Sequence, residues 1–313
     1  MTFHTKTFEA AKGKWRGILL SLGVPESALR DKHGPCPVCG GDDRFRFDNK
    51  EGAGTFICSH CGAGDGLKLA QLFTGLGFRE VASQIDALIG NITPDTVRPK
   101  AEITDEERRV ALRALWAQTK PVQYGDLADR YLTARGCGDT SYPKALRFGT
   151  SIRDGEGGIR PCLAAVVSNA EGHPVTMHRT FLRPDGLAKA EMASPRKLMP
   201  GSIPEGAAVR LSDGAASSIG IAEGIETALS ASALYGLPVW AAISAGMLAK
   251  WCPPPGCEEV AIFGDSDPGF AGQAAAYTLA HRLAVKGIAV TVHVPDTMGY
   301  DWNDVLMSRR KIS

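Results

Sequence analysis

Two short apolar runs, each followed by acidic residues and then by a helical pattern, constrain the fold of this chain more than any other feature. Residues 218–222 lead into Glu223, and residues 260–263 lead into Asp265 and Asp267. Apolar runs that alternate with helices are typical of a doubly wound parallel sheet. Ligands bind at the carboxyl ends of the strands in such sheets. The pattern therefore predicts an α/β domain with these three acids at one edge of its sheet.

A third acidic cluster follows a third candidate strand. Residues 288–294 form an apolar run, and Asp301 and Asp304 come after it. One Asp-x-Asp pair is common in loops, but acids after three successive strands indicate a shared site. Converging carboxylates repel one another unless cations lie between them, and Mg²⁺ and Mn²⁺ prefer oxygen ligands. We expect Asp265 and Asp267 to coordinate metal directly, and Asp301 to serve a second metal or its surroundings, with Asp304 behind it.

Two CxxC pairs near the start of the chain predict a structural zinc site. Cys36 and Cys39 are separated from Cys58 and Cys61 by 18 residues. Four thiolates at such a spacing suit tetrahedral Zn²⁺. A glycine directly after Cys39 and another after Cys61 allow the tight turns that aim backbone amides at sulfur.

The segment between the pairs alternates basic and aromatic residues and predicts strands of a ribbon. Arg44 and Arg46 fall on one face, and Phe45 and Phe47 on the other. Exposed aromatics beside arginines would bind single-stranded nucleic acid through stacking and phosphate contacts. Alternatively, the phenylalanines cover the zinc site and the arginines are merely solvated. The sequence leaves both interpretations open.

A basic segment precedes the acidic one. Residues 144–210 hold ten Lys/Arg and six Asp/Glu, whereas residues 211–304 hold three and ten. Such a balance suits a site where nucleic-acid phosphates meet bound metals, although uneven surface charge would look the same. Candidate strands at 145–149, 161–168 and 174–181 predict an antiparallel sheet here. Arg179, Lys189 and Lys197 are the candidates for binding template or nucleotide, with solvated surface charges as the alternative.

The two motif sets together resemble the zinc-ribbon-plus-Toprim DNA primases of phages, satellite phages and plasmids. Glu223-Gly and Asp265-x-Asp267 resemble the Toprim fold of DnaG-type primases, topoisomerases and related nucleases. HGPCPVCGGDDRFRFD followed by GTFICSHCGAGDGLKLAQLF resembles the primase zinc domain, and YLTARGCG, LRFG and HRTFL resemble the first part of the catalytic core. The resemblance covers roughly residues 33–308. It implies that the zinc domain takes part in template recognition and that Glu223 coordinates a metal or acts as a general acid/base.

Two positions depart from the resemblance. Replicative bacterial primases usually carry an acid four residues after the glutamate, where this chain has Thr227. Glu226 lies one position earlier and also fits as a partner of the helix dipole. Asn303 stands where some relatives have Asp. Both departures weaken the expectation of a complete second metal site.

Domain organisation follows from these motifs. We expect a multi-domain α/β protein with a small Cys₄ zinc β-ribbon and flanking helices in residues 1–90 and a linker in 91–103. A helical and basic N-terminal subdomain of the core would span 104–212, and a doubly wound Toprim domain 213–313. No apolar run approaches the roughly 18 residues of a membrane helix, and the polar start lacks a signal peptide, so we expect no membrane contact and a cytoplasmic protein.

The function predicted by the resemblance is DNA primase: short RNA primers made from NTPs on single-stranded DNA by metal-dependent nucleotidyl transfer, with structural Zn²⁺ and catalytic Mg²⁺ or Mn²⁺. The chain has no GxxxxGK[ST] loop, so we expect the helicase partner on a separate chain or a missing domain. Two alternatives remain. A non-catalytic recombination mediator would also combine a Cys₄ zinc site with a Toprim domain, and a Toprim nuclease would share the metals but hydrolyse the backbone.

Overall fold

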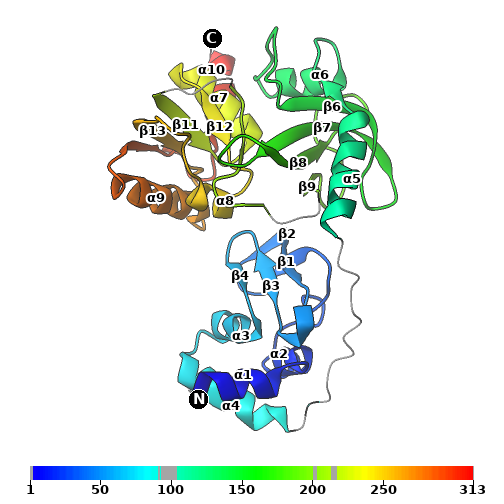
Figure 1. The fold of residues 1–313 in the computed structure, drawn as a ribbon, viewed down its shortest axis with the longest axis vertical. Coiled ribbons are helices and arrows are strands. Elements are labelled where there is room, and N and C mark those ends of the chain that lie inside the picture. Colours follow the sequence, from blue (N-terminus) through cyan, green and yellow to red (C-terminus); the bar gives the residue numbers. More distant parts are fainter. Residues whose placement is uncertain (1–2, 91, 93–103, 200–202, 213–216, 313) are drawn as a thin grey trace. The chain divides into compact units, whose positions relative to one another are not determined.

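The computed structural model describes residues 3–90, 92, 104–199, 203–212 and 217–312 of the protein. The chain divides into two compact units, residues 1–102 and 103–313, each of which is described by itself (Figure 1). The predicted linker, 91–103, lies outside the described residues except for Ile92.

The first unit is a four-stranded antiparallel ribbon with helices around it. Its strands follow the order β1-β2-β3-β4. The elements are α1 (Phe3–Ala11), α2 (Trp15–Ser21), β1 (Gly34–Cys36), β2 (Gly40–Phe47), the 3-10 turn η1 (Lys50–Gly52), β3 (Phe56–Cys58), β4 (Gly62–Gly64), α3 (Gly66–Thr74) and α4 (Phe78–Ile89).

The core of this unit decides between the two interpretations of the phenylalanines that lie between the cysteine pairs. Phe45 and Phe47 are 1% and 3% exposed and pack with Trp15 in one apolar cluster. The Phe45 ring stacks on Phe56 at a centroid distance of 5.7 Å. The interpretation of these two phenylalanines as exposed base-stacking groups is therefore wrong. Burying these two rings removes apolar surface from water and so stabilises the small unit.

The described residues of the second unit form one ten-stranded mixed sheet. Its main path runs β14-β13-β11-β12-β10-β7-β6-β5; off this path, β8 pairs with β7, and β9 pairs with β8. The strands are β5 (Lys120–Pro121), β6 (Leu146–Arg153), β7 (Ile159–Ser168), β8 (Pro174–Phe181), β9 (Arg196–Leu198), β10 (Ala208–Val209), β11 (Ser218–Ala222), β12 (Val239–Ala241), β13 (Glu259–Phe263) and β14 (Ala289–His293). The helices are α5 (Asp105–Ala117), α6 (Leu127–Ala134), α7 (Ile225–Tyr235), α8 (Ala245–Lys250), α9 (Ala271–Ala284) and α10 (Trp302–Ile312).

The parallel part of this sheet is covered on both faces. Ile221 and Ile262 pack in a cluster with residues of α8 and α9, whereas the alternate residues Ala222 and Phe263 pack with α7 and Trp302 of α10. Strands β11, β12, β13 and β14 are mutually parallel. The predicted doubly wound α/β architecture is confirmed. The three-residue strand β12 was not predicted from the sequence.

The antiparallel part is confirmed as well. β6 pairs with β7 and β7 with β8, both antiparallel, and β9 pairs with β8. Helix α5 opens with a capping box: the Thr104 hydroxyl accepts from the Glu107 amide, and the Glu107 carboxylate accepts from the Thr104 amide. Such reciprocal bonds satisfy two amides that a helix start otherwise leaves free.

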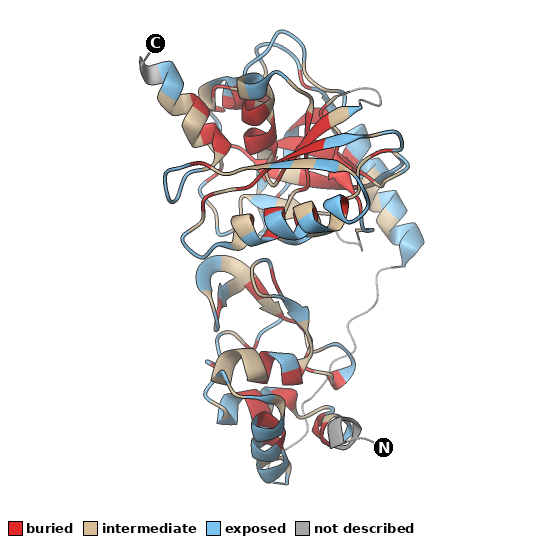
Figure 2. Ribbon diagram, turned by 90° about the vertical axis from the view of Figure 1, so that its left-hand side faces the viewer, coloured by how far each residue is buried: buried red, intermediate tan, exposed pale blue. Residues whose placement is uncertain are grey.

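Burial is concentrated on the strands and on the helix sides that face them (Figure 2). Helix α9, with 14 residues, exposes its outer side at positions such as Tyr277.

Spanning a lipid bilayer takes about 20 mostly apolar residues. Among the helices that the structure describes, none combines the length and the apolar character for this.

Candidate functional site

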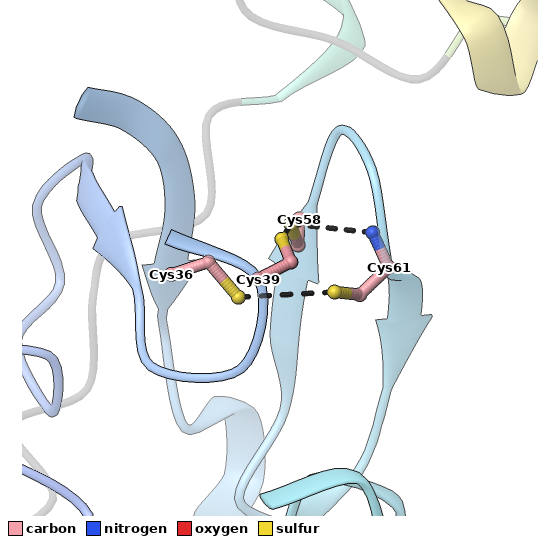
Figure 3. A group of neighbouring side chains, drawn as sticks. All are labelled: Cys36, Cys39, Cys58 and Cys61. Carbon is pink, nitrogen blue, oxygen red and sulfur yellow. Dashed lines mark hydrogen bonds between the residues drawn. The ribbon is translucent and has the colours of Figure 1, made fainter. Parts of the chain in front are cut away.

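The four predicted zinc ligands form one tight cluster. The sulfurs of Cys36, Cys39, Cys58 and Cys61 all lie within 4.8 Å of one another (Figure 3). Cys36 Sγ and Cys61 Sγ are 3.8 Å apart, and Cys39 Sγ and Cys58 Sγ are 3.7 Å apart. A tetrahedron with Zn–S bonds of about 2.3 Å has edges of about 3.8 Å. The cluster therefore has the dimensions of a tetrahedral zinc site.

Backbone amides support the sulfurs. The amide of Val38 donates to Cys36 Sγ at 3.4 Å, and the amide of Cys61 donates to Cys58 Sγ at 3.3 Å. Gly40 and Gly62 have φ of +68° and +86°, which confirms the tight turns expected after each pair. Burial, and then the neighbouring cysteines, raise the pKa of the Cys61 thiol above its ordinary value. A divalent cation between the sulfurs offsets this cost, because it favours the thiolate form.

The predicted acids meet at the carboxyl edge of the parallel sheet. Ala222 of β11 lies opposite Phe263 of β13, which lies opposite His293 of β14. Glu223 follows the first of these strands, Asp265 and Asp267 follow the second, and Asp301 follows the third. The structure therefore brings the four acids to one edge of three adjacent strands. Their oxygens are more widely spaced than the sulfurs: among the described side chains only the cysteines form a group of three or more metal-binding residues within 4.8 Å.

Asp265 lies at the centre of this acidic edge. Its Oδ1 is buried and has no hydrogen-bond partner among the described residues. Burial raises the pKa of the Asp265 carboxyl to about 8, and the charges of Glu223, Asp301 and Asp267 act in the same direction. A buried carboxylate that is repelled by three other carboxylates is stable in its charged form only beside cations. Asp265 thus has the environment of a metal ligand.

Asp267 is held by the start of α9. Its Oδ2 accepts from the Gly272 amide at 2.8 Å, which orients the carboxylate and leaves Oδ1 for another partner. Gly272 also allows α9 to lie against the acidic loop, because a Cβ at this position would come within 2.8 Å of the Asp265 carbonyl oxygen. Sequence reasoning missed Gly272; the short distance between the loop and the helix requires a residue without a side chain there.

Asp301 and Asp304 cap α10. Asp301 Oδ1 accepts from the Asp304 amide at 2.9 Å, and Asp304 Oδ2 accepts from the Asp301 amide at 3.1 Å. Burial raises the pKa of Asp301, and the charge of Asp304 adds to the rise. Asn303 is fully buried and donates to Ser230 Oγ at 2.9 Å, so its amide serves the contact between α10 and α7.

Glu226 has a role that the sequence did not reveal. It is 6% exposed, its carboxylate forms an ion pair of 3.0 Å with Lys189, and it accepts a hydrogen bond from the Tyr131 hydroxyl. Burial opposes its ionisation, but the Lys189 charge and the Tyr131 hydroxyl outweigh burial and hold the pKa of Glu226 at about 2. Glu226 thus links α7, which begins two residues after Glu223, to Tyr131 of α6 and to Lys189 in the loop between β8 and β9.

The predicted basic residues differ in how far the protein itself engages them. Lys197 Nζ donates to the Asp154 carbonyl at 2.9 Å and pairs with Glu156 at 2.7 Å. The Arg179 guanidinium donates to the carbonyls of Arg153 and Leu198, and burial lowers its pKa. In the first unit, Arg46 pairs with Asp31 at 2.6 Å, and the side chain of Arg44 lies over Gly41.

The charge of Arg196, which was not selected from the sequence, acts on both Asp265 and Glu226. Its guanidinium opposes the pKa rise of Asp265 and helps to lower the pKa of Glu226. It forms no ion pair with any residue in the described part of the chain. His178 is nearby and buried; burial lowers its pKa to about 4, and its Nδ1 has no described partner.

Three protein-family models match the chain in consecutive segments. Residues 31–67 match the zinc-binding domain of primase-helicase, 106–211 a domain of unknown function, and 218–311 the Toprim domain. The first match contains all four cysteines of the cluster, and the third contains all four acids of the edge. The expected resemblance is confirmed: the chain combines a primase-type zinc ribbon with a Toprim domain, which supports a role in DNA priming. The cysteine cluster and the zinc-binding family together support bound Zn²⁺.

Solved primase structures are similar at low identity. The Aquifex aeolicus primase (zinc-binding and RNA polymerase domains) is 16% identical, with 98% of this chain and 84% of that chain covered and a TM-score of 0.41. The primase fragment of the bacteriophage T7 primase-helicase protein is 16% identical, with 90% and 96% covered and a TM-score of 0.40. The E. coli primase catalytic core is 14% identical, with 65% and 67% covered and a TM-score of 0.34.

Proposed function

We propose that this protein is a DNA primase that synthesises short RNA primers on single-stranded DNA. The observation that carries the proposal is the convergence of four carboxylates, from Glu223, Asp265, Asp267 and Asp301, at the carboxyl edge of three adjacent parallel strands. Ligands bind at this edge in doubly wound sheets. The matched zinc-binding domain is of a primase type, which favours priming over other Toprim reactions.

The acidic edge fits a divalent metal. Its donors are carboxylate oxygens, and Asp265 Oδ1 is buried without a described partner. Mg²⁺ keeps several waters and usually takes one or two carboxylates together with substrate phosphates, which agrees with the open spacing of the acids. We propose that Asp265 and Asp267 hold the catalytic metal, with Glu223 and Asp301 completing the site. When bound, Mg²⁺ or Mn²⁺ would lower the pKa of the attacking hydroxyl and neutralise phosphate charge.

The reaction forms a bond between the primer 3′-oxygen and the α-phosphorus of an NTP. The bond from the α-phosphorus to the leaving oxygen breaks, and pyrophosphate departs. Where Glu223 does not coordinate metal, its carboxylate accepts the hydroxyl proton. Lys189 forms an ion pair with Glu226, and the charge of Arg196 acts on Asp265. Both cations would bind the triphosphate. Arg179 on β8 and Lys197 on β9 would bind the template DNA strand.

The first unit would recognise the template. With Phe45 and Phe47 buried, template contacts from this ribbon would come from Arg44 and Arg46 through DNA phosphates rather than from stacked bases. We also propose that a helicase, on a separate chain or a further domain, works with this protein, since its zinc-binding family is that of primase-helicases.

The test is primer synthesis on single-stranded DNA with labelled NTPs and Mg²⁺. We expect wild-type protein to make short RNA and the Asp265→Asn/Asp267→Asn variant to lose all of it. The matched control is Glu258→Gln/Glu259→Gln, which removes the same charge at the opposite end of β13 and should keep activity. Short products that persist in the Asn variant would refute the assignment.

The same assay separates the alternatives. A recombination mediator would bind single-stranded DNA but make no product with or without the two aspartates. A Toprim nuclease would shorten labelled DNA in the presence of metal and would not incorporate NTPs. Either result would overturn the primase proposal.

A further inference from the structure

Phe270 has an unusual backbone conformation beside the acidic edge. Its φ is +57°, in the left-handed region, where a residue with a Cβ is uncommon and destabilising. It stands between Asp267 and the first residue of α9, and its amide donates to the Asp267 carbonyl at 3.0 Å. Glycine would adopt this turn without strain.

Burial does not explain why a phenylalanine occupies this position. The residue is 60% exposed, and no aromatic ring or cation in the described part of the chain packs against its ring. Ile243, another non-glycine residue with positive φ, packs against the main core of the second unit and gains from that contact. An exposed aromatic ring in a strained turn points to a function, since strain of this kind concentrates at functional sites.

A second loop of the edge lies against the Phe270 loop. The Ser266 amide donates to the Tyr300 carbonyl at 2.9 Å, and the Gly299 amide donates to the Ser266 carbonyl at 2.6 Å. Tyr300 and Met298 are 38% and 53% exposed. The two loops that supply Asp265, Asp267 and Asp301 therefore also supply exposed apolar side chains.

We propose that Phe270 is a stacking platform for an unpaired nucleobase whose phosphate lies at the acidic edge. The inference rests on the proposed function, because that function places a nucleotide there. Aromatic side chains beside a phosphate-binding site are suited to single-stranded nucleic acid, since every base offers a π-face. The base belongs either to the incoming nucleotide or to the DNA strand, and both present the same chemistry to the ring.

The test uses three variants of the full chain. Phe270→Gly removes the ring and the strain together, Phe270→Leu removes only the aromatic face, and Phe270→Tyr keeps it. Tyr277→Ala is the matched control: Tyr277 is also 60% exposed and lies about two helical turns further along α9. Binding of a labelled single-stranded oligonucleotide is measured by fluorescence anisotropy, the KM for NTPs in primer synthesis, and stability by urea unfolding.

We expect Phe270→Gly and Phe270→Leu to weaken one of the two binding measures by a factor of roughly 5 to 150, the range for loss of one stacked base. Phe270→Tyr and Tyr277→Ala should remain close to wild type. A weaker oligonucleotide Kd assigns the base to the DNA strand, and a higher NTP KM alone assigns it to the incoming nucleotide. Phe270→Gly should be at least as stable as wild type.

Two results would overturn the proposal. One is unchanged oligonucleotide binding and unchanged NTP KM in both the Gly and the Leu variants. The other is a loss of stability in Phe270→Gly that accounts for its loss of binding, since the ring would then be structural. If wild-type protein makes no primers, the proposed function fails and the stacked base can only be that of the DNA strand; a weaker oligonucleotide Kd in the Gly and Leu variants then supports the platform, and an unchanged Kd overturns it.

Discussion

The cysteine cluster and the acidic edge, which we propose as a second metal site, are built in opposite ways. The four cysteines lie within 26 positions of the chain, and their sulfurs close to within 4.8 Å. The four acids span 79 positions, follow three strands, and leave Asp265 Oδ1 without a described partner. A closed set of protein ligands is characteristic of structural metals, and an open set of catalytic ones. The difference agrees with the proposal that the first region would use its metal to fold and the second would use one to react.

Removing zinc should give the largest effect and tests the closed site directly. Structural zinc contributes roughly 10–16 kcal/mol in small domains, so Cys36→Ser/Cys58→Ser should unfold the unit of residues 1–102. The unit of residues 103–313 has its own cores and should remain folded. Limited proteolysis followed by mass spectrometry would map the protected fragment. The control is Cys252→Ser/Cys257→Ser, which removes two thiols outside the cluster; equal protection of both units in the cluster variant would contradict the prediction.

Glu226 sharpens the comparison, because it is a carboxylate that the protein itself satisfies. Breaking a buried ion pair costs about 3–5 kcal/mol, so Glu226→Gln should lower the free energy of unfolding of the second unit by an amount in that range. Urea unfolding provides the measurement, and Glu258→Gln, an exposed change of the same kind, should alter stability very little. Adding Lys189→Met to Glu226→Gln should restore part of the loss, since no charge is then left unpaired. A double variant as unstable as the sum of the two single variants would argue against the pair.

The same residue predicts a pH dependence. The folded pKa of Glu226, about 2, lies below the ordinary value of 4.5, so the stability it contributes is present above about pH 4.5 and is lost as pH falls toward 2. The gap in unfolding free energy between wild type and Glu226→Gln should therefore be constant at neutral pH and shrink in acid. Urea titrations at several pH values would measure it. A gap that widens in acid would mean that the assigned direction is wrong.

Local patterns predicted what local forces determine. The strand 218–222 and the helical pattern after Glu223 were predicted correctly because their periodicity and flanking glycines define them, and the cysteine cluster followed from spacing alone. The burial of Glu226 depends on Tyr131, 95 positions away, which no local pattern encodes. The left-handed turn at Phe270 and the three-residue strand β12 were missed for a similar reason: tertiary packing imposes both.

Gly272 gives the smallest expected effect on stability and tests whether the acidic edge depends on backbone fit. A Cβ there would lie 2.8 Å from the Asp265 carbonyl oxygen and 3.0 Å from its amide nitrogen, so Gly272→Ala must push α9 away from the acidic loop. Overpacking of this kind costs about 1–3 kcal/mol, which leaves the unit folded. Displacing Asp265 and the amide that holds Asp267 should nevertheless lower kcat for primer synthesis far more than it lowers stability. Gly246→Ala, where nothing lies within 4 Å of the added carbon, is the control. If both alanine variants retain full kcat, the close approach of α9 does not position the acids, and the open edge tolerates more movement than its geometry implies.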